Sequence, residues 1–409
     1  MTVPGEPPSA ASNPRRILHV DVDAMFVQCA VMADSARLAG EPLILVGGSP
    51  TGRGVVTSAS YGCRAFGIHS AMPMATAVRL CPAAVVVPVP GEMIRTKSRE
   101  FASSLEAWAP VVNKASVDEA YLDLSGTEAL YRNEPLETTA RAIQRDLKDR
   151  TALDVSIGGA ANRLVAKLAT SFAKPAGVFI VPPGQEDSFV AGLELQDLTG
   201  VGPALRGSLS RHGIVDMAGL RAVDRETLSV WFGAERAGWL WRRCRGIDES
   251  PVRSREPTRS VSSETTFRQD TAEQESLERA LLGQVLDAAG SLRKQGLFAR
   301  TITVKLRDTD FRDRSRSRTL REAVQTDRVI FQTARQLLAD LRRDRDRPAR
   351  LIGVALTNLT TTGADEQGTF VDLAPPLEGE RDRALSLAVD RIRAKHGRVI
   401  GPGRIVGDG

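Results

Sequence analysis

The chain has 409 residues, a formal net charge of +5 and four cysteines. It is too long for one small core and predicts roughly two to four domains, so it can enclose a cleft. No apolar run reaches the length of a membrane span, and residues 1–14 lack the apolar core of a signal peptide. We therefore expect a disordered N-terminus and a cytoplasmic protein without membrane contact. The cysteines have neither disulfide-framework nor CxxC spacing, which predicts reduced, buried thiols and no zinc site.

An apolar run at residues 17–22 predicts the first strand. Side chains alternate across a strand, so Asp21 and Asp23 are expected on one face, with Val20 and Val22 on the other. Two carboxylates are thereby directed the same way at the end of this strand.

The fourteen residues from 54 to 67 predict a strand that runs into the start of a helix. Tyr61 and Arg64 lie three residues apart there, on one helical face. A phenolic hydroxyl and a guanidinium can both bind the oxygens of a triphosphate. The alternative is that the two side chains only cover a surface.

A second acidic cluster, Ser-Val-Asp-Glu-Ala-Tyr-Leu-Asp at residues 116–123, follows about a hundred residues after the first. It predicts a strand at residues 120–124, entered through a turn that carries Asp118 and Glu119. Buried acids need a counter-charge, and Mg²⁺ binds carboxylate oxygens, waters and substrate phosphates. If the two clusters meet in the fold, they form a divalent-metal site for a polyphosphate substrate. The alternative is two sets of strand-end acids that face water.

Residues 156–169 predict a strand, a turn of small residues and a helix that carries Lys167. On this helix the lysine would point back toward the acidic clusters. There it could neutralise negative charge that develops on a phosphate. An exposed helical lysine is the alternative.

A helical segment punctuated by glycine is predicted for residues 183–247. Within it, Gly200-Val201-Gly202 and the residues up to His212 have the pattern of a helix-hairpin-helix. A glycine-bearing turn exposes backbone N–H groups, which bind phosphates without reading bases. The pattern predicts DNA contact at Gly200 and Gly202, with a plain helical turn as the alternative. His212 is interpreted as structural.

A polar, proline-bearing linker is predicted at residues 248–258, followed by a separate small α+β domain at residues 259–361. Residues 253–361 hold 22 Lys and Arg against 15 Asp and Glu, so the basic excess of the chain is local. The expected elements of this domain are strands at residues 299–306 and 351–359 and helices at residues 272–295 and 328–343. A further helix is expected at residues 380–395.

Four arginines of this domain stand at alternate positions, namely Arg312, Arg314, Arg316 and Arg318. In an extended conformation all four would lie on one face, where they would suit a polyphosphate backbone. Aspartates are interleaved with them, so a solvated loop of mixed charge is the alternative.

Taken together, these motifs resemble the Y-family translesion DNA polymerases, in particular the DinB or DNA polymerase IV branch. Five motifs in the family's order carry the resemblance, over residues 17–359. It implies an α+β fold with right-hand polymerase architecture. The implied segments are a disordered N-terminus at 1–14, a palm at 15–27 and 92–178, fingers at 28–91, a helical thumb at 179–247, a linker at 248–258, a little finger at 259–361 and a C-terminal tail at 362–409.

The resemblance implies roles for the acidic residues. Asp21, Asp118 and Glu119 would bind two Mg²⁺ ions, or Mn²⁺, with help from the backbone carbonyl of Val22. One ion would activate the primer 3′-hydroxyl, and the other would hold the triphosphate. Asp23 would be structural.

Nucleotide and DNA contacts are implied as well. The residues expected around the nucleotide are Phe26, Ser58, Tyr61, Arg64 and Lys167. Phe26 would be the steric gate that excludes a 2′-hydroxyl, although Met25 stands where an aromatic residue often precedes the gate. The residues expected to contact DNA are Gly200, Gly202, Arg314, Arg316 and Arg318.

The implied partners are primer-template DNA and a deoxynucleoside triphosphate, for a monomeric enzyme of low fidelity without proofreading. The peptide at residues 367–373 lacks the Leu-Phe ending of a sliding-clamp motif, which argues against clamp binding and favours a polar linker. Two other functions are open, a DNA-binding scaffold that has lost catalysis and a nucleotide cyclase. The complete set of acids argues against the first, and the helix-hairpin-helix with the basic domain argues against the second.

Replacing Phe26 with alanine is expected to raise the incorporation of ribonucleotides, because the bulky ring would no longer clash with the 2′-hydroxyl. The measurement is single-nucleotide primer extension with a dNTP or the matching rNTP, with the wild-type protein alongside. An unchanged ratio of dNTP to rNTP incorporation would remove Phe26 from the gate role.

Overall fold

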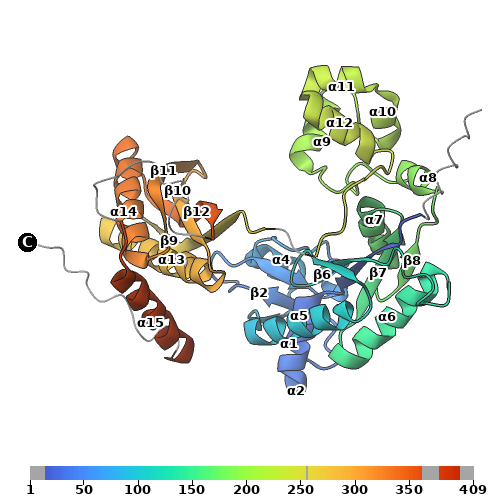
Figure 1. Cartoon of the computed structure of the whole chain (residues 1–409), viewed down its shortest axis with the longest axis horizontal. Coiled ribbons are helices and arrows are strands. Elements are labelled where there is room, and N and C mark those ends of the chain that lie inside the picture. Colours follow the sequence, from blue (N-terminus) through green and yellow to red (C-terminus); the bar gives the residue numbers. More distant parts are fainter. Residues whose placement is uncertain (1–13, 255–256, 362–376, 397–409) are drawn as a thin grey trace, which may run out of the picture. The chain divides into compact units, whose positions relative to one another are not determined.

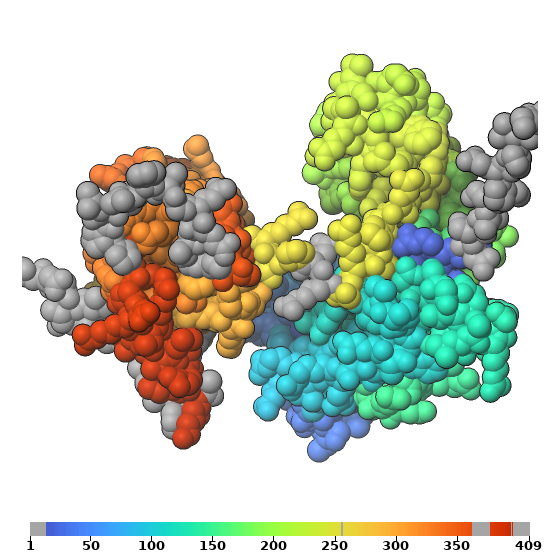
Figure 2. Space-filling view, viewed as in Figure 1, coloured from blue at the N-terminus to red at the C-terminus, as the bar shows by residue number. Residues whose placement is uncertain are grey.

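The computed structural model describes residues 14–254, 257–361 and 377–396 (Figure 1). The chain divides into two compact units between residues 256 and 257, within the predicted linker. Figure 2 shows both units in space-filling form from the same side, coloured along the chain. No helix among the described residues is long and apolar enough to cross a membrane. The peptide at residues 367–373 and the first thirteen residues lie outside the described part of the chain.

A five-stranded sheet lies at the centre of the first unit, in the order β5-β6-β1-β7-β8. Its strands are β1 (Ile17–Val22), β5 (Val111–Lys114), β6 (Glu119–Asp123), β7 (Val155–Ala160) and β8 (Val178–Ile180). The first strand has the predicted bounds and pairs antiparallel with both β6 and β7. Glu119 is the first residue of β6, so the predicted turn carries Asp118 alone.

Helices cover both faces of this sheet. On one face, Leu18 and Val20 pack in a core with α5 (Gly91–Glu106) and α6 (Leu136–Thr151). On the other face, Ile17 packs with α7 (Arg163–Ala173). Alternation along β1 therefore places Asp21 and Asp23 on the α7 side, as the sequence predicts.

A second, three-stranded sheet has the order β3-β2-β4, and it packs with its neighbouring helices around a separate apolar core. Its elements are β2 (Ile44–Gly47), β3 (Val56–Ala59), β4 (Val85–Val87), α3 (Tyr61–Arg64) and α4 (Met74–Leu80). The helices α1 (Met25–Ala33) and α2 (Ser35–Leu38) precede it, and α1 crosses the predicted boundary at residue 27. The predicted strand and helix start within residues 54–67 are both present. All four cysteines of the chain are buried and free.

Five helices follow the central sheet in the first unit. They are α8 (Glu186–Ala191), α9 (Pro203–Ser210), α10 (Met217–Ala222), α11 (Arg225–Phe232) and α12 (Ala234–Arg243). Because β8 pairs with β7, residues 178–180 belong to the sheet, and the predicted thumb boundary at 179 falls inside a strand. The hairpin glycines precede α9, whereas the residues just before them form turns instead of a regular helix.

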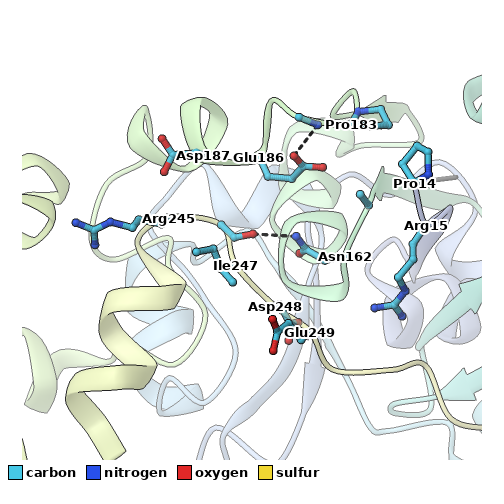
Figure 3. Close-up of a pocket in the computed structure, with 13 residues that line it drawn as sticks. Pro14, Arg15, Asn162, Pro183, Glu186, Asp187, Arg245, Ile247, Asp248 and Glu249 are labelled. Atoms are coloured by element: carbon cyan, nitrogen blue, oxygen red, sulfur yellow. Dashed lines mark hydrogen bonds between the residues drawn. The ribbon is translucent and has the colours of Figure 1, made fainter. Parts of the chain in front are cut away.

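The first half of the predicted linker is packed against the first unit instead of being free. Just before the linker, Asn162 donates to the carbonyl of Gly246 at 2.8 Å, beside a cavity of about 580 Å³ (Figure 3). Within the linker, Asn113 donates to the carbonyl of Arg253 at 2.6 Å. Arg163 donates to the carbonyl of Pro251 at 3.1 Å, and Val252 is 6% exposed. Polar, proline-bearing composition predicts an irregular segment but does not reveal these hydrogen bonds to its carbonyls.

The second unit contains a four-stranded antiparallel sheet in the order β11-β10-β12-β9. Its strands are β9 (Ser260–Thr271), β10 (Phe298–Asp308), β11 (Asp313–Val324) and β12 (Ala349–Thr360), and its helices are α13 (Gln274–Lys294), α14 (Asp327–Asp344) and α15 (Glu380–His396). The predicted strands and helices of this unit are confirmed, and α15 matches the helix expected at 380–395. The helices α13 and α14 pack on the apolar face of the sheet.

Helix α15 is held by one buried guanidinium. Arg293 of α13, whose side chain is 1% exposed, makes ion pairs with Asp390 at 2.6 Å and Asp327 at 2.9 Å. It also donates to the carbonyl of Gln325 at 2.7 Å. Removing one member of a buried ion pair leaves a charge without compensation.

Substituting methionine for Arg293 is therefore expected to lower the free energy of unfolding of the second unit by about 3 kcal/mol. Urea denaturation of the full-length protein measures it. Arg279→Met is the matched control on the same helix, since its pair with Glu275 is largely exposed and should contribute about 0.5 kcal/mol. Equal effects of the two substitutions would contradict the buried-pair account.

Candidate active site

The two acidic clusters meet at one end of the central sheet. In the pairing of β1 with β6, Asp21 stands opposite Glu119. The backbone N–H of Val22 donates to the carbonyl of Asp118 at 2.9 Å, which fixes the turn before β6 beside the end of β1. Asp118 is half-buried in that turn, and its carboxylate accepts a hydrogen bond from Ser116. Strand register therefore brings together acids that are about a hundred residues apart.

Asp21 carries the strongest sign of crowded negative charge. Burial raises the pKa of this carboxyl to about 6, the neighbouring Lys174 opposes that effect, and the carboxylates of Glu119 and Asp118 add to it. Lys174 Nζ lies 2.5 Å from Asp21 Oδ1. The lysine thus supplies a positive charge where three carboxylates repel one another.

Glu119 is held by a different cation. Lys167 Nζ lies 2.8 Å from Oε1 and 2.7 Å from Oε2. His19 Nε2 lies 3.8 Å from Oε2, longer than a hydrogen bond. The His19 ring and Lys167 together lower the pKa of Glu119 to about 2, against the effect of burial. The predicted orientation of Lys167 toward the acidic cluster is confirmed.

Lys174 was not predicted from the sequence as a site residue. It follows α7 directly, seven residues after Lys167. Seven residues are close to two helical turns, so the two lysines share a face of this segment. That spacing was the available signal, and its meaning depends on α7 packing against β1.

The carboxylates fit a divalent cation by their chemistry. Asp21, Asp118, Glu119 and the carbonyl of Val22 are hard oxygen donors, the type that Mg²⁺ and Mn²⁺ prefer. In the described residues, no three Asp, Glu, His or Cys groups form a ready-made metal cage. Instead, two lysines balance the surplus negative charge. A metal cation would take over that balancing role.

Asp23 is a structural hub of the first unit. It is 4% exposed and accepts hydrogen bonds from Tyr61 Oη at 2.6 Å, Ser156 Oγ at 2.8 Å and the backbone N–H of Ala176 at 2.8 Å. These donors come from three separate segments. The hydrogen bonds confirm the expectation that Asp23 is structural, and they connect α3 to the central sheet.

Of the residues expected around the nucleotide, Tyr61 contacts this hub directly. Arg64 stacks on the ring of Tyr61, with Cζ 4.7 Å from the ring centroid, which confirms that the two share a face. Ser58 is buried in β3, and Phe26 packs between two apolar cores at the start of α1. Ala24, just before α1, has left-handed backbone geometry with φ 42°, which turns the chain sharply after β1. Their contact with a nucleotide stays a prediction.

The alternating arginines lie along β11, and their common face is the one that α14 covers. Arg314 pairs with Asp308, which is fully buried, at 2.9 and 3.0 Å. Arg316 pairs with Asp344 at 2.6 Å, and Arg318 donates to Gln336 of α14. The predicted spacing on one face is correct for the residues within the strand. Their contact with DNA stays a prediction, since each already has a partner.

The hairpin glycines lie beside a groove between α9 and α12, with a volume of about 1090 Å³. Gly200 has φ +96°, and an added Cβ would lie 2.6 Å from the Trp239 ring, so only glycine fits this turn. Arg211, Arg236 and Arg242 line the groove. His212 stacks on Trp231 with ring centroids 4.3 Å apart, which confirms its structural interpretation.

Changing Asp23 to asparagine is expected to lower the free energy of unfolding by about 2 kcal/mol, because an amide places a donor against donors in a buried site. Urea denaturation measures the loss. Asp154→Asn is the control, since the Asp154 side chain is 49% exposed and pairs with Lys148 at the surface. If both variants were equally stable, Asp23 would not be the hub described here.

Comparison with known proteins identifies relatives over most of the chain. The impB/mucB/samB family model matches residues 20–171, and the model of that family's C-terminal domain matches residues 258–370. DNA polymerase IV of Alkalilimnicola ehrlichii is 37% identical over 86% of this chain and 97% of that protein. DNA polymerase IV of Halorhodospira halophila is 38% identical over 84% of this chain and 95% of that protein.

Solved structures agree on the fold. A Y-family DNA polymerase chimera superposes with a TM-score of 0.75 at 23% identity, covering 85% of this chain and 100% of that one. DinB from Sulfolobus solfataricus superposes with a TM-score of 0.57 at 24% identity, covering 84% of this chain and 98% of that one. On the family models and relatives together, the chain belongs to the impB/mucB/samB family, in the DNA polymerase IV branch of the Y-family polymerases.

Proposed function

We propose that this chain is a template-directed DNA polymerase that copies damaged template without proofreading, adding deoxynucleotides to a primer 3′-hydroxyl. The observation that carries the proposal is the meeting of Asp21, Asp118 and Glu119 at one sheet end, faced by Lys167 and Lys174. Family membership and relatives named DNA polymerase IV support the same reaction.

We infer that the three carboxylates and the carbonyl of Val22 hold two Mg²⁺ ions, with Mn²⁺ as a substitute. Such ions stabilise the attacking and leaving oxygens of an in-line phosphoryl transfer. The surplus negative charge at Asp21 supports this assignment, because a divalent cation would balance it.

Lys167 and Lys174 have a second task in this proposal. Each ammonium now binds a carboxylate at 2.5–2.8 Å. With the carboxylates holding metal ions, both ammonium groups would be available to the triphosphate, where they would offset negative charge on the leaving pyrophosphate. Tyr61 and Arg64 would contribute a hydroxyl and a guanidinium to the same oxygens.

Nucleotide selection is assigned to the start of α1. Phe26 lies two residues after the turn at Ala24, close in sequence to the metal carboxylates, which suits a ring that packs under the sugar. Ser58 of β3 belongs to the same site in this proposal. A deoxynucleoside triphosphate is then the preferred substrate.

In the domain assignment that we favour, the central sheet is the palm, the sheet β3-β2-β4 the fingers, α8–α12 the thumb and the second unit the little finger. The hairpin at Gly200 and Gly202, with the groove beside it, would bind DNA phosphates. Arg314, Arg316 and Arg318 would contact DNA only by exchanging their present partners for phosphates. The sheet face opposite α13 and α14 therefore becomes a second candidate for that contact. We expect a monomer.

A catalytically inactive scaffold or a nucleotide cyclase explains fewer features. A scaffold has no need for three converging carboxylates, and a cyclase has no need for a helix-hairpin-helix and a basic second unit. An assay of templated nucleotide addition to a primer distinguishes a polymerase from both alternatives.

Asp118→Ala is expected to slow single-nucleotide addition by at least roughly a thousandfold, because a metal contact worth several kcal/mol in the transition state is lost. Primer-template affinity should be retained, since it depends on the thumb and the second unit. Primer extension with Mg²⁺ and a fluorescence binding assay measure the two quantities. Glu137→Ala is the control, an exposed acid of α6 that pairs with Arg141. Loss of binding in step with activity, or no addition by the wild-type protein, would count against the proposal.

A further inference from the structure

His19 is a buried titratable side chain beside the carboxylates that has no role in the proposed mechanism. It lies on β1 two residues before Asp21, on the same face of the sheet, and is 1% exposed. The Tyr121 ring centroid is 4.6 Å away, and Thr170 Oγ1 of α7 lies 2.8 Å from Nδ1. Nε2 is directed at Glu119 Oε2 at 3.8 Å and has no hydrogen-bond partner among the described residues.

The neighbours of the two ring nitrogens determine the tautomer. A neutral imidazole carries its proton on one nitrogen and accepts at the other. The carboxylate of Glu119 favours a proton on Nε2, because a lone pair there would face negative charge. Nδ1 then accepts, and the hydroxyl of Thr170 directs its single proton to Nδ1 at 2.8 Å instead of to the carbonyls of Ala166 at 3.0 Å and His19 at 3.3 Å, which lie farther away. Thr170, His19 and Glu119 thus form a directed chain from α7 through β1 to β6.

We propose that His19 is a positioning residue for Glu119, with the Nε2–H of a ring oriented by Thr170 fixing the carboxylate in the orientation that binds a divalent cation. While Lys167 holds both oxygens, the His19 contact stays long. A shortening of roughly 0.8 Å, as the lysine leaves, turns it into a hydrogen bond. The inference rests on the proposed function, in which Glu119 is a metal ligand.

The chain offers variants that separate this role from simple packing. His19→Gln keeps an amide N–H near the position of Nε2 and so keeps the donor toward Glu119. His19→Asn keeps a polar group near Nδ1 and loses that donor. Thr170→Val removes the hydroxyl at nearly constant volume. Thr139→Val is the matched control, since Thr139 is likewise 2% exposed, and its hydroxyl has no hydrogen-bond partner in the part of the chain that is described.

The first experiment measures Mn²⁺ affinity by electron paramagnetic resonance on the full-length protein bound to primer-template, together with the Mg²⁺ dependence of nucleotide addition. Partners behind a metal ligand change affinity or activity by about 10- to 100-fold. We expect His19→Asn to weaken Mn²⁺ binding at least about tenfold, and His19→Gln to restore most of it. Thr170→Val should fall between them, and Thr139→Val should match the wild type. Equal Mn²⁺ affinity of the Asn and Gln variants would overturn the proposal.

A second experiment reads the tautomer directly. The chain has four histidines, so ¹⁵N NMR of histidine-labelled protein can assign the His19 ring. We expect the proton on Nε2 in the wild type and a loss of that preference in Thr170→Val; a proton on Nδ1 in the wild type would overturn the proposal. Neither metal affinity nor tautomer requires turnover. Both readouts therefore remain decisive if the wild-type protein adds no nucleotide, a result that would overturn the proposed function instead.

Discussion

Repulsion among three carboxylates at one end of the central sheet is the constraint on which the rest of the first unit depends. Strand register places Asp21 opposite Glu119, and the turn before β6 adds Asp118. Such a cluster is stable only with positive charge nearby. Helix α7, which packs on β1 through apolar side chains, and the residue after it supply that charge as Lys167 and Lys174. In a phosphoryl-transfer enzyme the same surplus charge is what attracts the metal ions.

The end of β1 also joins parts of the first unit that could otherwise move apart. Asp23, two residues after Asp21, accepts hydrogen bonds from Tyr61 of α3, Ser156 of β7 and the backbone N–H of Ala176, just before β8. Tyr61, a candidate for substrate binding, is therefore connected through Asp23 to the strand that carries Asp21, a candidate metal ligand. Asp23, which is not expected to bind metal, thus helps to fix the position of Asp21, which is.

Local periodicity in the sequence predicted the elements that carry strong apolar patterns, and long-range register had to come from the structure. The bounds of β1 followed from its apolar run, and the direction of Lys167 followed from the predicted succession of strand, turn and helix at residues 156–169. Strand β9 was missed because its face toward α13 also carries polar residues, such as Ser263, which donates to Gln284, so the apolar alternation is weak. The arginines of β11 were correctly placed on one face, but spacing does not say which face a helix covers. Lys174, the Thr170–His19 contact and the packed first half of the linker all depend on partners distant in the sequence, which no local pattern contains.

The most direct test of the central claim is a crystal structure of the full-length protein with primer-template, a non-hydrolysable dNTP and Mg²⁺. The account predicts two metal ions bound by Asp21, Asp118 and Glu119, with Lys174 moved from Asp21 toward the triphosphate. Metal ions bound elsewhere, or a Lys174 that still pairs with Asp21 beside a bound nucleotide, would contradict it.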